Sequence, residues 1–194
     1  TTGTNNIFIG GLAGDATTDA DDNVAVGMQA LSTNTLGSAS TAIGKDALHD
    51  QNPATATLMY NVAVGYHAGR LISTGVKNVI VGALAGDTLT TGERNVYVGH
   101  TSGDRATTGT FNTGVGAETL FFNVAGNKNT AVGEAALFAM TAATSTDTFN
   151  TAVGFNSGSA ITSGTKNVLI GALAGDALTD SEQNVAVGYG ALTS

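Results

Sequence analysis

The side chains best suited to catalysis or metal binding are scattered along this chain of 194 residues. The three histidines, His49, His67 and His100, occupy three different positions of a repeated pattern, so we do not expect them to act together as a base or as ligands. The chain has no cysteine, no Gly-x-Ser-x-Gly motif, no P-loop and no Gly-x-Gly-x-x-Gly fingerprint. We therefore expect neither an enzyme nor a cofactor.

One acidic stretch begins like a calcium loop. Asp19, Asp21 and Asp22 have the early spacing, but the glycine and the closing glutamate of such a loop are missing. Calcium remains an alternative to the absence of a cofactor. Four other aspartates directly follow a glycine and are expected to stabilise turns. They are Asp15, Asp87, Asp104 and Asp176.

Composition excludes several classes of protein. The net charge is −8 with only seven Lys and Arg, which argues against a nucleic-acid surface. No apolar run approaches the roughly 18 to 20 residues of a membrane span, and Thr1-Thr2-Gly3-Thr4 is not a signal peptide. Hydrophobic residues make up 42%, so the low charge does not predict disorder.

The elements that position these side chains are set by one repeat. Asn, three strand-type residues, Gly, two variable residues and a small residue recur eleven times, with eight steps of 17 residues and two of 21. Such a period predicts a parallel β-solenoid, an all-β fold in which each repeat forms one turn. We expect residues 1–194 to form a single repeat domain. Its turns are expected to start near residues 6, 23, 40, 61, 78, 95, 112, 129, 150, 167 and 184.

The strand of each repeat carries no charged residue at any of its three positions. Val, Ile or Thr flank a middle residue, and we expect the flanking residues to point into the coil and the middle residue to point outward. The outward column would then be apolar, and large apolar patches mark interfaces. The sequence predicts a self-association stripe on this column at Phe8, Ile80, Tyr97 and Leu169. Further along each turn, Gly alternates with Leu, which predicts two turn types, one of them with leucine in the interior.

A column of threonines predicts a second short strand. Seven of ten complete repeats carry Thr twelve residues after the Asn, as in Thr90-Thr91-Gly92, and a glycine turn follows in most. A regular Thr array is also typical of an ice-binding solenoid, although this column is interrupted at Asn52 and Val124.

The two longer repeats contain insertions at residues 49–60 and 138–149, which are 89 residues, or five turns, apart. They should therefore project from the same face of the solenoid. Insertions on one face often form its binding surface, and a tolerated surface loop is the alternative. The candidate recognition residues in the two loops are His49, Asp50, Tyr60, Phe138, Asp147 and Phe149.

Four of the repeats share a recognisable form. Asn23-Val-Ala-Val-Gly27, Asn61-Val-Ala-Val-Gly65, Asn129-Thr-Ala-Val-Gly133 and Asn184-Val-Ala-Val-Gly188 resemble the head repeats of YadA-like trimeric autotransporter adhesins, and similar repeats occur in phage tail fibres. The resemblance implies a left-handed β-roll in which three chains pack around an axis and the head binds host surfaces. The period of 17 is longer than is usual in that family.

Together these features favour a structural and adhesive rod of an extracellular, cell-surface or virion fibre. The expected partners are further copies, as a homotrimer or a head-to-tail filament, and a host surface glycan or protein. Neither end shows a polar cap, and joining Ser194 to Thr1 of a second copy would nearly keep the period, so we expect part of a longer fibre or filament. The alternatives are an ice-binding solenoid and a carbohydrate-active β-helix protein.

Overall fold

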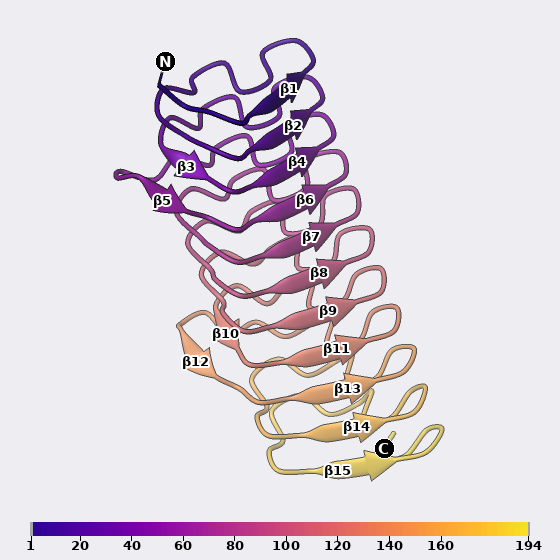
Figure 1. Cartoon of the computed structure of the whole chain (residues 1–194). Coiled ribbons are helices and arrows are strands. Elements are labelled where there is room, and N and C mark those ends of the chain that lie inside the picture. The colour runs from indigo at the N-terminus through magenta and orange to yellow at the C-terminus, as the bar shows by residue number, and fades with distance from the viewer. Residues whose placement is uncertain (1, 194) are drawn as a thin grey trace.

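The computed structural model describes residues 2–193, which form 15 β-strands stacked along one axis (Figure 1). No helix in this range is long and apolar enough to cross a membrane. Eleven strands form one sheet: β1 (Ile7–Ile9), β2 (Val24–Val26), β4 (Thr41–Ile43), β6 (Val62–Val64), β7 (Val79–Val81), β8 (Val96–Val98), β9 (Thr113–Val115), β11 (Thr130–Val132), β13 (Thr151–Val153), β14 (Val168–Ile170) and β15 (Val185–Val187). Four two-residue strands form two small sheets: β3 (Gly37–Ser38), β5 (Thr57–Leu58), β10 (Gly126–Asn127) and β12 (Thr146–Asp147).

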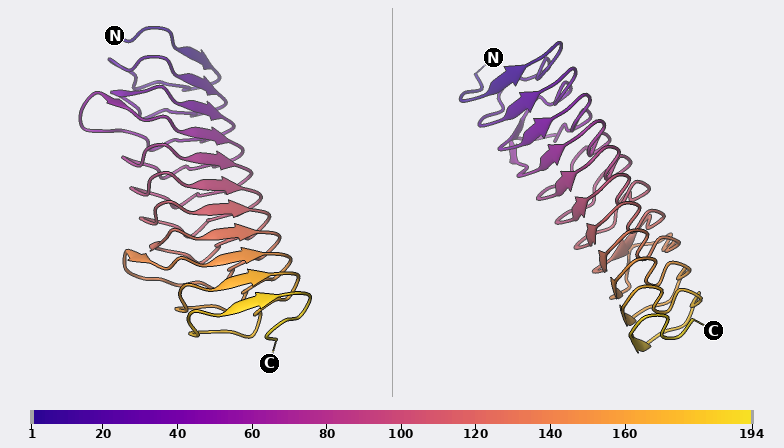
Figure 2. Two further views of the ribbon diagram at one scale, coloured as in Figure 1. Left: turned by 60° about the horizontal axis from the view of Figure 1, so that its bottom comes forward. Right: turned by 90° about the vertical axis from the view of Figure 1, so that its right-hand side faces the viewer.

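Each main strand pairs in parallel with the strand of the next repeat. Ile7 lies opposite Val24, and Val62 lies opposite Val79, so equivalent residues of successive repeats are neighbours. The turns stack into a rod with β1 and β15 at opposite ends (Figure 2). The predicted β-solenoid of about eleven turns is confirmed.

The predicted orientation of the strands is wrong. The middle residue of each strand lies inside the coil, and the flanking Val, Ile and Thr face outward. Ile80, Tyr97 and Leu169 are fully buried, whereas Val79 is 37% exposed. The predicted self-association stripe is therefore core, and only Phe8, in the first turn, is partly exposed. Alternation with a period of two defines two faces, but it does not say which is inside when both are apolar.

The middle residue shares the interior with the residue six positions later in the same turn, and the sizes of the two are matched. Six residues after Tyr97 stands Gly103, where a methyl group would lie 2.7 Å from the tyrosine ring carbons. Six residues after the small Ala25 stands Leu31, which is fully buried. Phe8, Ile80 and Leu169 are followed by Gly14, Gly86 and Gly175, and Ala42, Gly114 and Ala131 by Leu48, Leu120 and Leu137.

The two predicted turn types are thus two ways of filling one interior. Two turns combine Ala with Gly at these positions, and there a third side chain fills the space: Ile72 beside Gly69 and Ile161 beside Gly158. A large residue at one position is matched by a small one at the other, because close-packed interiors tolerate neither gaps nor extra bulk.

Between the two end turns, the asparagine that opens a repeat is buried and binds three turns together. The side-chain Oδ1 of Asn78 accepts a hydrogen bond from the backbone N–H of Asn95, at 2.9 Å. Asn95 Nδ2 donates to the same Oδ1 at 3.2 Å and to the carbonyl oxygen of Gly109, across the coil, at 2.8 Å. The same pattern recurs along the stack, so most of these amides satisfy donors and acceptors that the interior would otherwise leave unpaired.

Ser40 interrupts this column, and Gln51 replaces the missing amide. Gln51 is fully buried; its Oε1 accepts from Ser40 Oγ at 3.1 Å and from Asn61 Nδ2 at 2.9 Å. The turn that lacks the asparagine is the first of the two turns that carry an insertion. The longer turn therefore supplies from another position the acceptor that its serine cannot provide.

The strand glycine is required by backbone packing. Gly44 has a φ of +133°, and a Cβ atom there would lie 2.3 Å from the carbonyl oxygen of Gly65 in the next turn. The strand glycines from Gly10 to Gly171 all make the same approach, which explains why this position does not vary among them.

The predicted second strand forms only beside the insertions. β5 pairs with β3, and β12 pairs with β10, each in parallel. In the other turns the threonine column keeps turn-to-turn hydrogen bonds without forming a strand, as in Thr90 N to Thr107 O at 2.9 Å. The glycine two residues later bends the chain before it can extend.

Exchanging the two turn types tests the core. We expect Tyr97→Ala to cost about 3 to 5 kcal/mol and Gly103→Leu about 1 to 3 kcal/mol of unfolding free energy. The double variant recreates the Ala25 and Leu31 combination, so it should cost at least about 1 kcal/mol less than the sum. Denaturant unfolding of the four proteins measures this coupling, and strict additivity would show that the two positions do not share one space.

Removing one buried amide tests the asparagine column. Asn95→Ala leaves the Asn112 N–H and the Gly109 carbonyl without partners, so we expect a loss of about 3 kcal/mol in unfolding free energy. Thr91→Ala, at an exposed position of the preceding turn, should change it by less than about 0.5 kcal/mol. A loss below about 1 kcal/mol for Asn95→Ala would show that the column contributes little.

Candidate interaction surfaces

The outward side of the eleven-stranded sheet, here called the sheet face, is a long and uniform surface. Two columns of β-branched side chains run along it, one residue from each strand in each column. The first column consists of Ile7, Val24, Thr41, Val62, Val79, Val96, Thr113, Thr130, Thr151, Val168 and Val185. The second consists of Ile9, Val26, Ile43, Val64, Val81, Val98, Val115, Val132, Val153, Ile170 and Val187. Neither column contains a charged residue, and all of these side chains are exposed or half-buried.

Most hydroxyls of the threonine column, on another side of the coil, bond to the next turn. Thr18 Oγ1 donates to Thr35 O at 3.0 Å, and Thr90 Oγ1 donates to Thr107 O at 3.0 Å. Thr162 Oγ1 makes the same bond to Thr179 O at 3.2 Å. These hydroxyls stabilise the stack, and their donor protons are directed at the next turn instead of at solvent.

Both insertions project from the same side of the rod, where the chain enters the main strands (Figure 1). Tyr60 and Phe149, which end the two insertions, are 51% and 46% exposed. Asp147 lies in β12, and its Oδ2 forms an ion pair with Lys128 Nζ at 2.6 Å. That contact holds the pKa of Asp147 below its usual range.

The other candidate recognition residues lie apart from these three. Phe138 stacks on Phe121 with ring centroids 5.3 Å apart and lines an open cavity of about 330 Å³ together with Glu118 and Asn156. His49 pairs with its neighbour Asp50, Nδ1 to Oδ1 at 2.5 Å. The structure therefore does not bring the six predicted residues together in one site.

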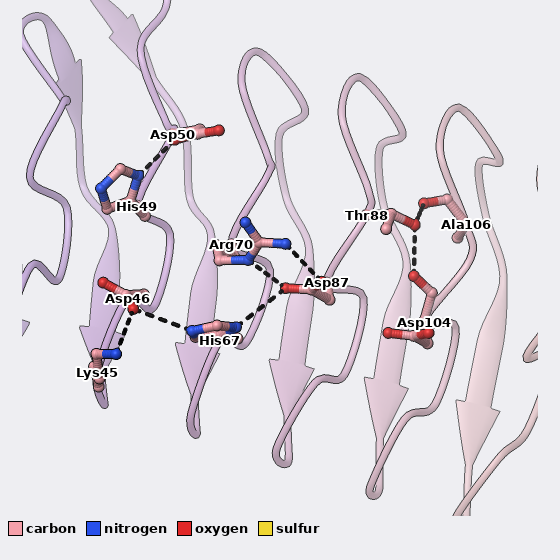
Figure 3. A network of polar contacts seen from close by, with 10 residues as sticks. All are labelled: Lys45, Asp46, His49, Asp50, His67, Arg70, Asp87, Thr88, Asp104 and Ala106. Carbon is pink, nitrogen blue, oxygen red and sulfur yellow. Dashed lines mark hydrogen bonds and ion pairs between the residues drawn. The ribbon is translucent and has the colours of Figure 1, made fainter.

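A chain of charged side chains crosses three turns at the corner after the strands (Figure 3). Arg70 donates two hydrogen bonds to the carboxylate of Asp87, at 2.8 and 2.9 Å. His67 Nε2 lies 3.1 Å from Asp46 Oδ2, and Lys45 Nζ lies 3.4 Å from the same oxygen. The Asp87 contact raises the pKa of Arg70 further above its ordinary value. Each carboxylate already has a cationic or histidine partner, so this network is a cross-turn clamp.

Of the other aspartates, Asp104 is partly buried, and Asp21 and Asp22 contact the preceding turn. Burial, with the nearby charge of Asp87, raises the pKa of Asp104. In the stretch that resembles a calcium loop, Asp21 accepts hydrogen bonds from Thr4 N and Thr4 Oγ1, which lower its pKa, and Asp22 accepts from Asn5 Nδ2. Within residues 2–193, no group of three or more His, Cys, Asp or Glu is placed to hold a metal ion.

Comparison of the chain with protein-family models, with curated proteins and with solved structures finds no match.

The Lys128 and Asp147 pair makes a testable prediction about pH. Because the folded pKa of Asp147 is lowered, the contact stabilises the loop above the ordinary aspartate pKa and is lost as pH falls through the folded pKa. We expect Lys128→Gln to move the Asp147 pKa upward, toward its ordinary value, in an NMR titration. Lys166→Gln is the control and should leave that pKa unchanged; an unchanged pKa in Lys128→Gln would contradict the assignment.

Proposed function

We propose that the chain is a structural and adhesive rod of an extracellular or virion fibre, and that it assembles with further copies of itself through the sheet face. The observation that carries this proposal is the uncharged pair of Val, Ile and Thr columns along all eleven strands. Parallel sheets are normally covered on both faces, and here side chains of the same turns cover only the inner one.

The size of the face is consistent with an interface. Ten steps of about 4.8 Å between strands give a length of about 48 Å. A strip about 10 Å wide then covers roughly 500 Å², within the range of the largest apolar patches on soluble proteins, which are often functional. The flat and regular columns of one copy can interdigitate with those of another. Three copies around an axis would bury the strips together, as the resemblance to YadA-like head repeats implies.

A rod of this kind requires no catalytic step. A carbohydrate-active β-helix would need free carboxylates facing a substrate groove, and the clustered carboxylates of Asp46 and Asp87 face His67 and Arg70 instead. The proposed role is therefore attachment and spacing, with extension of the fibre provided by the stack itself.

Ice binding remains a second candidate because the sheet face is flat and carries β-branched side chains in two regular columns. Only the first column includes threonines, at Thr41, Thr113, Thr130 and Thr151. Ice-binding activity would appear as thermal hysteresis of the purified protein, and its absence would remove this candidate.

Charging the centre of the sheet face tests assembly. We expect the wild-type protein to form a discrete oligomer in sedimentation equilibrium, and Val81→Lys with Val98→Lys to shift it to monomer, because lysines would be buried unpaired in the interface. The control is Thr91→Lys with Thr108→Lys, which adds the same charge to exposed positions in the same two turns and should keep the oligomer. Circular dichroism checks that both variants fold. A wild-type protein that stays monomeric at all concentrations would contradict the proposal.

A further inference from the structure

One column of side chains combines most of the basic residues of the chain with aromatic residues. It stands directly before the asparagine column and is here called the entry row. Over seven successive turns the entry row consists of Tyr60, Lys77, Arg94, Phe111, Lys128, Phe149 and Lys166. All seven side chains are exposed. Each member stands two residues before a main strand, and both insertions project from the side where the chain enters these strands (Figure 1).

The row concentrates positive charge on an acidic protein. Four of the seven Lys and Arg of the chain lie in it, so the remaining charges are 3 − 15 = −12. The other three, Lys45, Arg70 and Arg105, each contact an aspartate at the opposite corner of the coil. In the part of the chain that the structure describes, the cations without an ion-pair partner are Lys77, Arg94 and Lys166.

The backbone holds the row at a fixed spacing. Every member has a φ between 52° and 62°, in the left-handed region. The backbone N–H of Lys77 donates to Met59 O at 2.8 Å, that of Arg94 to Val76 O at 3.0 Å, and that of Phe111 to Glu93 O at 3.1 Å. Each bond joins one turn to the turn before it. The side chains therefore project from a rigid ladder, one about every 4.8 Å.

Cations and aromatic rings alternate from Arg94 to Lys166, and two of the neighbouring pairs are in contact. Arg94 Cζ lies 5.1 Å from the ring centroid of Phe111, and Lys128 Nζ lies 5.0 Å from that of Phe149. These distances are within the range of cation–π interactions, which restrict the long basic side chains. Residues of the same kind are two turns, or about 9.6 Å, apart.

We propose that the entry row binds a linear acidic glycan laid along the axis of the rod. Carboxylate or sulfate groups would pair with Lys and Arg, and the apolar faces of sugar rings would stack on Phe111, Phe149 and Tyr60. The two-turn period is close to the length of one disaccharide in an extended chain, so a glycan charged at every second sugar meets a cation at each repeat.

This charge pattern favours a glycan over a nucleic acid. A nucleic acid carries dense phosphate charge, and its binding requires many neutralising contacts. Here the cations form a single row, and Glu93 and Asp147 lie beside Arg94 and Lys128. Sparse charge with exposed rings between the charges suits a sugar polymer better. The inference rests on the proposed function, because it names the ligand class for the adhesive part of that role.

The test compares two double variants of equal charge. Lys77→Gln with Lys166→Gln removes two unpaired cations of the row, and Gln183 already occupies the equivalent position of the next turn. Lys45→Gln with Arg105→Gln removes two cations elsewhere, so both variants go from −8 to −10. The labelled probes are heparin and hyaluronan oligosaccharides of equal length, with neutral dextran and single-stranded DNA as comparisons, measured by fluorescence anisotropy at low salt.

We expect at least one acidic oligosaccharide to bind and the row variant to lower its affinity at least tenfold, against less than twofold for the control. Phe111→Ala with Phe149→Ala, which leaves the net charge unchanged, should lower it at least fivefold. Binding of heparin alone would assign sulfate as the recognised group, and binding of both would assign carboxylate as sufficient.

Four results would overturn the inference: equal losses in the two charge variants, equal binding of dextran, equal binding of single-stranded DNA, or no binding of either acidic probe. The outcome is separable from the assembly test. Glycan binding is also measured on Val81→Lys with Val98→Lys, so a monomer that binds would support the row without the oligomer. An oligomer that binds no glycan would support assembly without the row.

Discussion

The structure depends on the hydrogen bonds by which one turn is fixed on the next, and the buried asparagine column sets their register. Each Asn Oδ1 accepts the backbone N–H of the following repeat, as in Asn167 N to Asn150 Oδ1 at 3.0 Å. Its Nδ2 reaches across the coil, as in Asn150 Nδ2 to Gly164 O at 2.8 Å. A slip of one residue would leave these amides unpaired in the interior, where each unsatisfied group costs about 1 to 3 kcal/mol.

Once the register is fixed, the neighbours of every side chain are decided by its column. Interior side chains then have to share the limited space within their own turn, which is why Tyr97 requires Gly103 and Ala25 allows Leu31. At the corner, an aspartate of one turn meets a cation of the turn before it, as Asp87 meets Arg70. The same stacking also places equivalent exposed residues of successive turns in rows, because each turn contacts only its neighbours.

The period and the strand residues were sufficient to predict the solenoid, its turn boundaries and the two projecting loops. The face of the strand could not be predicted from alternation, because Val96, Tyr97 and Val98 are all strand-forming and apolar. A signal was nevertheless present: large middle residues occur only with glycine six positions later. Such matching within a repeat indicates contact between the two positions and would have placed Tyr97 inside. The pairing of β5 and β12 with earlier turns was not predictable, because it depends on how each insertion folds back.

A stack of this kind separates what is constant from what can vary. The glycine before each corner cannot change, since a side chain at Gly44 would collide with the backbone of Gly65. The side chain before the asparagine points away from the core, so Asp22, Lys77 and Phe149 all occupy this position with the same left-handed backbone. Charge and aromatic character can therefore be changed along one row without affecting the core. The sheet face lies on the same turns yet contains no charge in either column. An uncharged face of this length along eleven strands is what the proposed assembly through the sheet face requires.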